Sequence, residues 1–367
     1  MSQTVCGFIG LGLIGGSIAR ALKEKQADNI KILAYDIDST TLSLAKEEGI
    51  ADLITPEINE LFSSCDFLFL CAPVENNNHN LKLIKKYLSP NCILTDVGSV
   101  KSGIHEQIIA AGLSEQFIGG HPMAGSERTG FINSKARLLE NAYYILTPSS
   151  DVNKEWIHRY ETLVKSMGAI PLILDASQHD YVTAAVSHLP HVIASSLVNL
   201  VKRCDSSEGI MKMIAAGGFK DITRIASSSP DMWQQICTTN SENISELLGK
   251  YIEDLQTLKI YIDKKDSLEL TDFFDTARTY RDSFIDAGSG PIKNTYFLYV
   301  DIADEPGALA AIATILALNG ISIKNIGITH NRELQEGALR IEFHEESAIG
   351  LARTLLMSKG YIIYDRK

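Results

Sequence analysis

The sequence of 367 residues predicts a doubly wound α/β domain, then an all-α domain, then a small βαββαβ domain. Three observations predict this order. Short apolar runs alternate with helical patterns up to about residue 175, strand-like runs then stop, and they return after a cluster of breaker residues at 287–291. We therefore expect domains at residues 1–175, 176–290 and 291–367.

The first domain is expected to be built around a mostly parallel sheet with helices on both faces, because strands and helices alternate along it. The expected strands are short apolar runs: Val5–Ile9, Ile30–Tyr35, Phe67–Cys71, Ile93–Asp96, Phe117–Gly119, Tyr143–Leu146 and Ile170–Leu174.

The second domain is expected to be purely helical, since no strand pattern follows Ala176. The expected helices are Gln178–Arg203, interrupted at Pro190, and then Glu208–Ala226, Asp231–Leu258 and Asp266–Ile285. Long helices rich in Ala, Ser and Leu with no sheet to cover favour an intertwined homodimer; packing within one subunit is the alternative.

The third domain follows the breaker cluster Ala287-Gly288-Ser289-Gly290-Pro291. Its pattern is strand, helix, strand, strand, helix, strand, over Tyr296–Ile302, Leu309–Asn319, Ile321–Thr329, Gly337–Phe343, Ser347–Lys359 and Tyr361–Asp365.

Composition argues against several classes of partner. The formal net charge is −11 without a basic face, so we expect no nucleic-acid partner. No apolar run has membrane-spanning length and the first residues lack the basic start of a signal peptide, so we expect a soluble cytoplasmic protein. The six cysteines show no metal-ligand spacing, and we expect free thiols and no metal site.

A glycine-rich turn follows the first expected strand. Residues 10–15 fit G-x-G-x-x-G and are Gly10, Leu11, Gly12, Leu13, Ile14 and Gly15. The turn opens a helix and precedes a second strand that ends at Asp36, which are the contexts of a dinucleotide-binding Rossmann motif. The helix N-terminus can stabilise a pyrophosphate. Ala72 and Pro73 follow another strand and are expected along the cofactor.

Asp36 predicts which dinucleotide binds. It lies 21 residues after Gly15, where a carboxylate can accept hydrogen bonds from the adenosine ribose. A 2′-phosphate would be repelled by this carboxylate, and the following residues, Ile37 and Asp38, include no arginine. We therefore predict NAD rather than NADP.

His121 is the strongest candidate for a catalytic group. It stands in the segment GGHPMAGSE, residues 119–127, directly before Pro122, which disfavours the α region for its backbone. A titratable group in a tight loop at the carboxyl edge of a strand is where α/β enzymes carry their chemistry. The alternative is that His121 only satisfies a turn.

Three further segments gather polar side chains. They are DVGSVK at 96–101, SHLPH at 187–191 and GGFKDITR at 217–224. Structural interpretations stay open for His188 as a buried helix residue, Lys220 as a solvated side chain and Arg224 as a partner of Asp221.

These motifs together resemble the NAD-dependent prephenate dehydrogenases that carry a C-terminal ACT domain. The resemblance covers essentially the whole chain. The motifs that carry it are GLGLIGGS at 10–17, DVGSVK at 96–101, GGHPMAGSE at 119–127, SHLPH at 187–191 and GGFKDITRIA at 217–226. It implies oxidative decarboxylation of prephenate to 4-hydroxyphenylpyruvate, on the route to tyrosine.

The resemblance also implies roles for individual residues. His121 would accept the proton of the substrate hydroxyl, which Ser99 would help to orient, and Arg224 would bind a carboxylate. Further substrate contacts are implied for His191, Ser187, Gly217 and Lys220. A place in the partner subunit's site is an open alternative for the last two, and Glu127 would be able to pair with Arg224.

In the third domain, the segment 304–309 (DEPGAL) matches the D-x-P-G-x-L signature of ACT domains, which bind free amino acids. The resemblance implies an effector site, with tyrosine as the expected effector, that includes Asp304, Pro306, Gly307 and Asn325. A domain used only for assembly is the alternative.

Other functions remain open at this point. An arogenate dehydrogenase would keep the same chemistry with an amino acid side chain on the substrate. A 3-hydroxyacid dehydrogenase is disfavoured because its lysine-centred pattern is absent. A non-catalytic regulator responding to NAD and amino acids would not need Ser99, His121 and Arg224 together.

Overall fold

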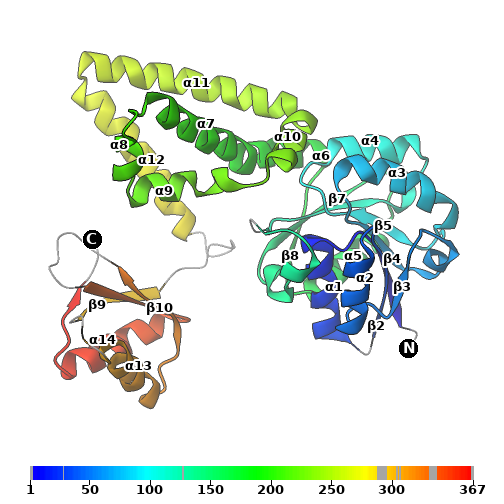
Figure 1. Ribbon diagram of the computed structural model, residues 1–367, viewed down its shortest axis with the longest axis horizontal. Coiled ribbons are helices and arrows are strands. Elements are labelled where there is room, and N and C mark those ends of the chain that lie inside the picture. The colour runs from blue at the N-terminus through cyan, green and yellow to red at the C-terminus, as the bar shows by residue number, and fades with distance from the viewer. Residues whose placement is uncertain are drawn as a thin grey trace. The chain divides into compact units, whose positions relative to one another are not determined.

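The computed structural model describes residues 3–27, 29–125, 128–286, 296–302, 305, 307–329 and 337–364. The chain forms two compact units, Met1–Leu270 and Thr271–Lys367 (Figure 1). The division falls inside helix α12 (Ser267–Asp286), whereas the sequence places its last boundary at the breaker cluster. The domain limits at residues 175 and 290 therefore stay predictions.

A five-stranded parallel sheet forms the centre of the first unit, in the order β3-β2-β1-β4-β5. Its strands are β1 (Thr4–Ile9), β2 (Ile30–Tyr35), β3 (Leu53–Thr55), β4 (Phe67–Leu70) and β5 (Ile93–Asp96). The doubly wound α/β fold is confirmed; only the short edge strand β3 was not expected. The strand order progresses outward in one direction from β1 to β3 and in the other direction from β4 to β5. At such a topological switch point, between β1 and β4, a crevice for ligands is expected at the carboxyl ends of the strands.

Side chains alternate along each strand, so they point to both faces of the sheet, and helices bury both faces. In β4, Phe67 and Phe69 belong to one apolar core, while Leu68 and Leu70 belong to a second core on the opposite face. The covering helices are α1 (Leu13–Gln26), α2 (Ser39–Glu47), α3 (Val74–Ile84), α4 (Ser102–Ala110) and α5 (Lys154–Ser166). Short helical turns connect them: η1 (Glu60–Ser64), η2 (Lys85–Tyr87), η3 (Ser114–Gln116), η4 (Phe131–Asn133) and η5 (Ala136–Leu138).

A second sheet continues the first one beyond β5. It contains β6 (Ile118–Pro122), β7 (Tyr143–Pro148) and β8 (Ile170–Ile173), and β7 runs antiparallel to β6 and parallel to β8. A single bridge from Leu94 to Phe117 connects the two sheets. His121 lies within β6, opposite Ile145, and not in a loop after the strand as expected. Extended backbone before a proline is compatible with a strand, which explains the longer β6.

A buried ion pair fastens the junction between the two sheets. The Lys101 ammonium lies 2.5 Å from an Asp96 carboxylate oxygen and donates to the Gly120 carbonyl at 2.7 Å. The other Asp96 oxygen accepts from the Gly120 N–H at 3.2 Å. Lys101 and Asp96 are 0% and 2% exposed. Burial lowers the pKa of Lys101, and the Asp96 charge opposes that shift. This pair ties the loop after β5 to the strand that carries His121.

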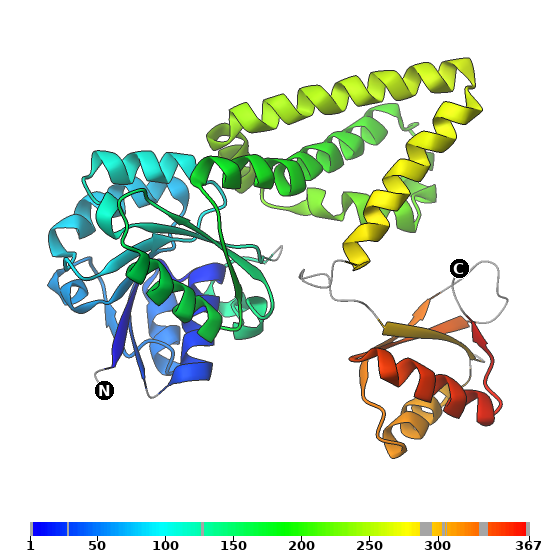
Figure 2. The same cartoon turned by 180° about the vertical axis from the view of Figure 1, so that it is seen from behind.

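One helical run connects the sheets to the helical part of the first unit (Figure 2). It contains α6 (Ala176–Thr183), a π turn η6 (Ala184–His188) and α7 (Leu189–Cys204). The sequence predicts an interruption at Pro190, but the run continues through it. A π turn adds a residue to the local turn and relieves the clash and lost N–H that a proline brings to a helix interior.

Two of the predicted helices, Glu208–Ala226 and Asp231–Leu258, are each divided into shorter helices. They are α8 (Ile210–Ile214), α9 (Gly217–Thr223), η7 (Arg224–Ser227), α10 (Pro230–Thr239) and α11 (Ser241–Lys264). Asn240 leaves helical geometry between α10 and α11, and its amide donates to the Asp180 carbonyl at 2.8 Å. Gly217 and Gly218, which favour helix weakly, stand where the other segment restarts.

The second unit contains a four-stranded sheet in the order β10-β11-β9-β12. Its elements are β9 (Tyr296–Ile302), α13 (Ala308–Leu318), β10 (Ile323–Thr329), β11 (Gly337–Phe343), α14 (Glu346–Ser358) and β12 (Ile363–Tyr364). The described strands pair antiparallel, and Ile312, Leu316 and Leu356 of the helices join the strands in one apolar core.

We predict that Lys101→Met lowers the free energy of unfolding by about 3 kcal/mol, because it leaves the Asp96 carboxylate buried without its counter-ion. The measurement is urea unfolding of the first unit within the full chain. Lys101→Met combined with Asp96→Asn should recover part of the loss.

Lys23→Met is the matched control, because Lys23 also lies 2.7 Å from a carboxylate, that of Asp52, but in a more exposed pair. It should cost much less. Equal losses in the two variants would show that the buried pair has no special weight.

Candidate functional site

The glycine-rich turn lies at the β1–β4 crevice and each of its glycines has a distinct surrounding. Gly10 has φ +99°, and a Cβ there would lie 2.8 Å from the Ala72 backbone nitrogen. A Cβ on Gly15 would lie 2.7 Å from the Gly10 carbonyl oxygen, so close packing of helix and strand requires glycine. A Cβ on Gly12 would meet nothing within 4 Å. The space beside Gly12 is therefore open to a ligand.

The first turn of α1 fits a dinucleotide pyrophosphate. Gly12 is its N-cap, no side chain caps it and no acidic residue stands in the first turn formed by Leu13 and Ile14. Uncapped N–H groups at a helix N-terminus attract an anion. Asp36 ends the neighbouring strand and accepts from the Leu11 N–H at 2.6 Å and the Asp38 N–H at 2.9 Å. Its carboxylate is thereby fixed beside the turn.

Ala72 and Pro73 lie at the same crevice, between β4 and α3. The Cys71 N–H donates to the Ile9 carbonyl at 2.8 Å, which keeps this segment beside β1. Pro73 is the N-cap of α3. The structure therefore brings together the predicted cofactor residues from three loops.

His121 is half-buried and contacts a histidine that the sequence analysis did not select. Its Nδ1 lies 2.8 Å from Nε2 of His179 in α6. His179 Nδ1 in turn lies 2.8 Å from a carboxylate oxygen of Asp180. His179 and Asp180 are 0% and 1% exposed. The chain of three side chains connects the strand β6 to the start of the helical run.

The surroundings of His121 favour its neutral form. Burial is the main cause that lowers its pKa well below 6.5, and His179, Lys101 and His188 lower it further, while Asp180 opposes the shift. The pKa of His188 is also lowered, to about 4, chiefly by burial. A neutral imidazole at physiological pH can accept a proton.

Ser99 lies partly buried in the loop between β5 and α4. This loop is held against β6 because Gly98 donates to Asp96 at 2.9 Å and Lys101 donates to Gly120. Ser99 and His121 therefore come from adjacent strand ends that share one buried ion pair.

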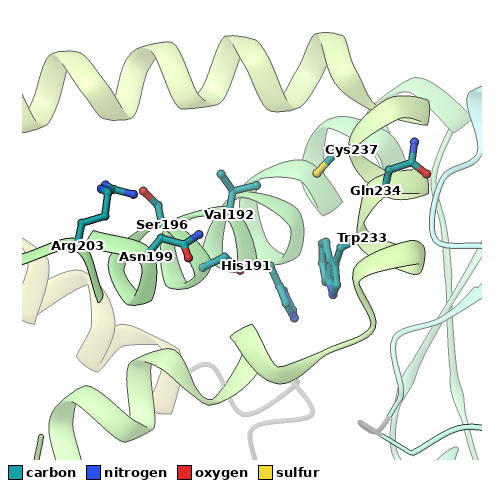
Figure 3. A pocket seen from close by; sticks show the side chains of 9 residues that line it. His191, Val192, Ser196, Asn199, Arg203, Trp233, Gln234 and Cys237 are labelled. Carbon is teal, nitrogen blue, oxygen red and sulfur yellow. The ribbon is translucent and has the colours of Figure 1, made fainter. Parts of the chain in front are cut away.

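A pocket of about 430 Å³ opens along α7 and α10 (Figure 3). The His191 ring stacks on Trp233 with their centroids 3.7 Å apart. His191 Nδ1 donates to the Ser187 carbonyl at 3.0 Å, which leaves Nε2 as an acceptor while the ring is neutral. Arg203 and Asn199 line the pocket farther along α7.

Arg224 belongs to the same region, because its segment η7 packs against α7. Burial is the main cause that lowers the pKa of His191, and the charge of Arg224 lowers it further. The hydrogen bond from His191 to the Ser187 carbonyl acts in the opposite direction. Gly217 and Lys220 of α9 are exposed. Glu127 lies outside the described residues. His188 is 1% exposed, and its Nδ1 lies 3.2 Å from the side-chain nitrogen of Asn240. This agrees with its interpretation as a buried helix residue.

The predicted effector residues fall in the second unit. Gly307 has φ +95° and precedes α13, and Asn325 is exposed on β10. Asp304 and Pro306 lie outside the described residues. A pocket of about 360 Å³ adjoins this turn; its lining residues include Asp301, Glu305, Ala308 and Tyr361.

The model of the prephenate dehydrogenase nucleotide-binding domain matches residues 18–172, and that of the prephenate dehydrogenase dimerization domain matches residues 175–276. The prephenate dehydrogenase of Bacillus subtilis (strain 168) is 37% identical over 94% of this chain and 93% of its own length.

Solved structures agree with these matches. Prephenate dehydrogenase from A. aeolicus, in complex with hydroxyphenyl propionate and NAD+, is 32% identical with a TM-score of 0.73, over 77% of this chain and 99% of that one. Synechocystis arogenate dehydrogenase is 27% identical with a TM-score of 0.69, over 77% of this chain and 100% of that one. The chain belongs to the prephenate dehydrogenase family.

Proposed function

We propose that this protein is an NAD-dependent prephenate dehydrogenase that converts prephenate to 4-hydroxyphenylpyruvate and carbon dioxide. The observation that carries the proposal is a half-buried His121 on β6, which follows a parallel bridge to β5 and so ends at the same carboxyl edge as the strands of the dinucleotide-binding crevice. Burial is the main cause that lowers the pKa of His121. Membership of the family, with a relative that matches over nearly the full length, supports the same reaction.

The chemistry asks the protein mainly for orientation and for one proton acceptor. NAD, when bound, accepts the hydride from the ring carbon that bears the hydroxyl. His121 takes the hydroxyl proton, with Ser99 orienting that hydroxyl. As the carbon–carbon bond to the ring carboxylate breaks, its electron pair enters the ring, which becomes aromatic, and carbon dioxide leaves. The phenolic oxygen can then recover the proton.

The residues proposed to hold NAD come from the β1–β4 crevice. Gly10, Gly12 and Gly15, with the intervening Leu11, Leu13 and Ile14, would surround the pyrophosphate at the start of α1. Asp36 would accept hydrogen bonds from the adenosine ribose, and Ala72 and Pro73 would line the cofactor. Open space at Gly12 and the uncapped helix support this assignment.

Of the residues proposed to hold the substrate, His191 lines the α7 pocket. Arg224 would bind a carboxylate through its planar guanidinium, which can donate two parallel hydrogen bonds. His191 and Ser187 would contact the pyruvyl end, and Glu127 would modulate access. The packing of η7 against α7 supports the grouping of Arg224 with His191.

We propose a homodimer in which Gly217 and Lys220 reach the site of the partner subunit. Their exposure supports this, as do large apolar side chains exposed nearby, including Met213 at 74%, Ile214 at 70% and Ile222 at 61%. Large apolar side chains left exposed in this number are often found at subunit interfaces.

We also propose that the protein is soluble and cytoplasmic. Among the described helices, the run Ala176–Cys204 is long and apolar enough by composition to cross a membrane, contrary to the sequence expectation. It carries His179, Asp180 and His188, which are hydrogen-bonded within the protein. Such a polar segment supports a place inside an enzyme rather than a lipid bilayer.

Residues 291–367 are proposed to form an ACT domain that binds tyrosine and lowers activity. Their element order, βαββαβ, supports this, as does a pocket beside the turn at Gly307. The site would include Asp304, Pro306, Gly307 and Asn325. The match to the Bacillus subtilis relative over 94% of the chain supports a shared C-terminal part.

His121→Asn should lower kcat for prephenate by roughly 10²- to 10⁴-fold, because the proton acceptor is lost. The measurement is NADH formation with prephenate and, in parallel, with arogenate. NAD affinity should not change. Faster turnover of arogenate by the unaltered protein would replace prephenate as the substrate, and near-normal turnover of the variant would remove His121 from the mechanism.

Arg224→Ala should raise the KM for prephenate by roughly tenfold to a hundredfold, because charge-assisted hydrogen bonds to a carboxylate are lost. Arg203→Ala is the comparison, since Arg203 lines the same pocket farther along α7. An increase of KM only in Arg203→Ala would place the carboxylate at the other end of the pocket.

Asn325→Ala should weaken inhibition by tyrosine while kcat stays unchanged, because Asn325 lies on the proposed effector edge and far along the chain from the chemistry. The measurement is the tyrosine concentration that halves the rate. Thr354→Ala on α14 serves as the control. Equal inhibition in all three proteins would argue that tyrosine binds elsewhere.

A further inference from the structure

We propose that Asp180 and His179 are positioning residues that hold His121 in the one neutral tautomer able to act as the base. This inference rests on the proposed function of His121 and deepens it. It concerns two buried side chains of α6 that no motif of the sequence analysis included: His179, which contacts His121, and Asp180, which contacts His179.

The first step is the ionisation and saturation of Asp180. Besides His179, its carboxylate accepts the backbone N–H of Lys101 at 2.7 Å and that of Ser102 at 2.8 Å. Burial alone would raise its pKa, but these hydrogen bonds lower it below 3.8 overall. A carboxylate that accepts from three donors has only acceptor atoms to offer to His179. Therefore His179 Nδ1 carries a proton and donates it to Asp180.

The second step concerns the effect of the His179 proton position on His121. A neutral His179 ring carries a single ring proton, which stands on Nδ1, so its other nitrogen, Nε2, carries a lone pair. This Nε2 lies 2.8 Å from His121 Nδ1, which must then be the donor. His121 Nε2 is left with a lone pair for the substrate. The two contacts thus select the basic nitrogen of His121.

The same contacts support the charged form of His121 during turnover. When Nε2 takes a proton, Nδ1 still donates to His179, and the Asp180 charge stabilises the new cation through it. Lys101 from the loop after β5, His188 from the π turn and His179 itself oppose a positive charge on His121, whereas the Asp180 charge favours it.

The contacts are also braced from the helical part. Asn240 donates to the Asp180 backbone carbonyl at 2.8 Å, and its amide nitrogen lies 3.2 Å from His188 Nδ1. The backbone of Asp180 is therefore held independently of its carboxylate. A substitution of the carboxylate can change the hydrogen bonds to His179 while Asn240 still holds the helix.

The direct test is the tautomer of His121, measured by ¹⁵N–¹H correlation spectra of protein labelled at histidine nitrogens. The His121 signals are assigned by their loss in His121→Asn. We expect a proton on Nδ1 and a lone pair on Nε2 in the unaltered protein. A proton on Nε2 would overturn the proposal. This measurement needs no substrate, so it holds even if prephenate is not what the enzyme oxidises.

Asp180→Asn is the kinetic test. Asparagine removes the negative charge and offers one donor group where the carboxylate offers two acceptor oxygens to His179, Lys101 and Ser102, so at least one of these contacts is lost. We expect kcat to fall, within the roughly 10²- to 10⁴-fold that a positioned base contributes, while the KM for prephenate stays little changed. The His121 signals should show a larger share of the tautomer with its proton on Nε2.

The pH profile separates this role from general damage. Because the Asp180 charge raises the His121 pKa, its removal should shift the acid limb of kcat/KM to lower pH. Asp175→Asn is the matched control: Asp175 caps the same helix through Gln178 but is exposed. It should leave kcat, the acid limb and the tautomer unchanged. An Asp180→Asn enzyme with normal kcat, or with an unmoved acid limb, would contradict the proposal.

Discussion

The buried contact between Lys101 and Asp96 is the constraint on which the site depends. An ammonium and a carboxylate with almost no exposure are stable only while each satisfies the other and nearby backbone groups. Here those backbone groups belong to Gly98 and Gly120. The loop with Ser99 and the strand with His121 are therefore fixed to each other by charge. Among the residues that the structure describes, a single β-bridge joins the two sheets at this junction.

Lys101 contributes to the electrostatics of the site through both its side chain and its backbone. The Lys101 side chain is directed to Asp96, while its backbone N–H is directed to Asp180. A cation close to His121 disfavours a second positive charge, and burial adds to this effect. The base is therefore kept neutral by its surroundings, and Asp180 moderates the cost of its protonation during the reaction. Both carboxylates that approach the site are bound by backbone N–H groups, which leaves them no freedom to rotate.

The sequence predicts the architecture well where local pattern decides it. Apolar alternation and glycine spacing define the parallel sheet and the turn from Gly10 to Gly15. It predicts less where distant segments meet. The partnership of His121 with His179 depends on β6 and α6 coming together across 58 residues. Nothing near His179 distinguishes it from an ordinary residue in the first turns of a helix. Likewise, the break at Asn240 follows from a hydrogen bond to a carbonyl 60 residues away.

The π turn before Pro190 has a geometrical consequence for the evolution of the site. Each residue of an α-helix advances the side-chain direction by about 100°, so one extra residue rotates everything that follows it by that angle. The extra residue in Ala184–His188 thus sets the angle between the face with His179 and Asp180 and the face with Ser187 and His191. Deleting it would retain every functional side chain but aim the two groups in different directions. The register of this helical run therefore decides the orientation of these side chains, in addition to their identity.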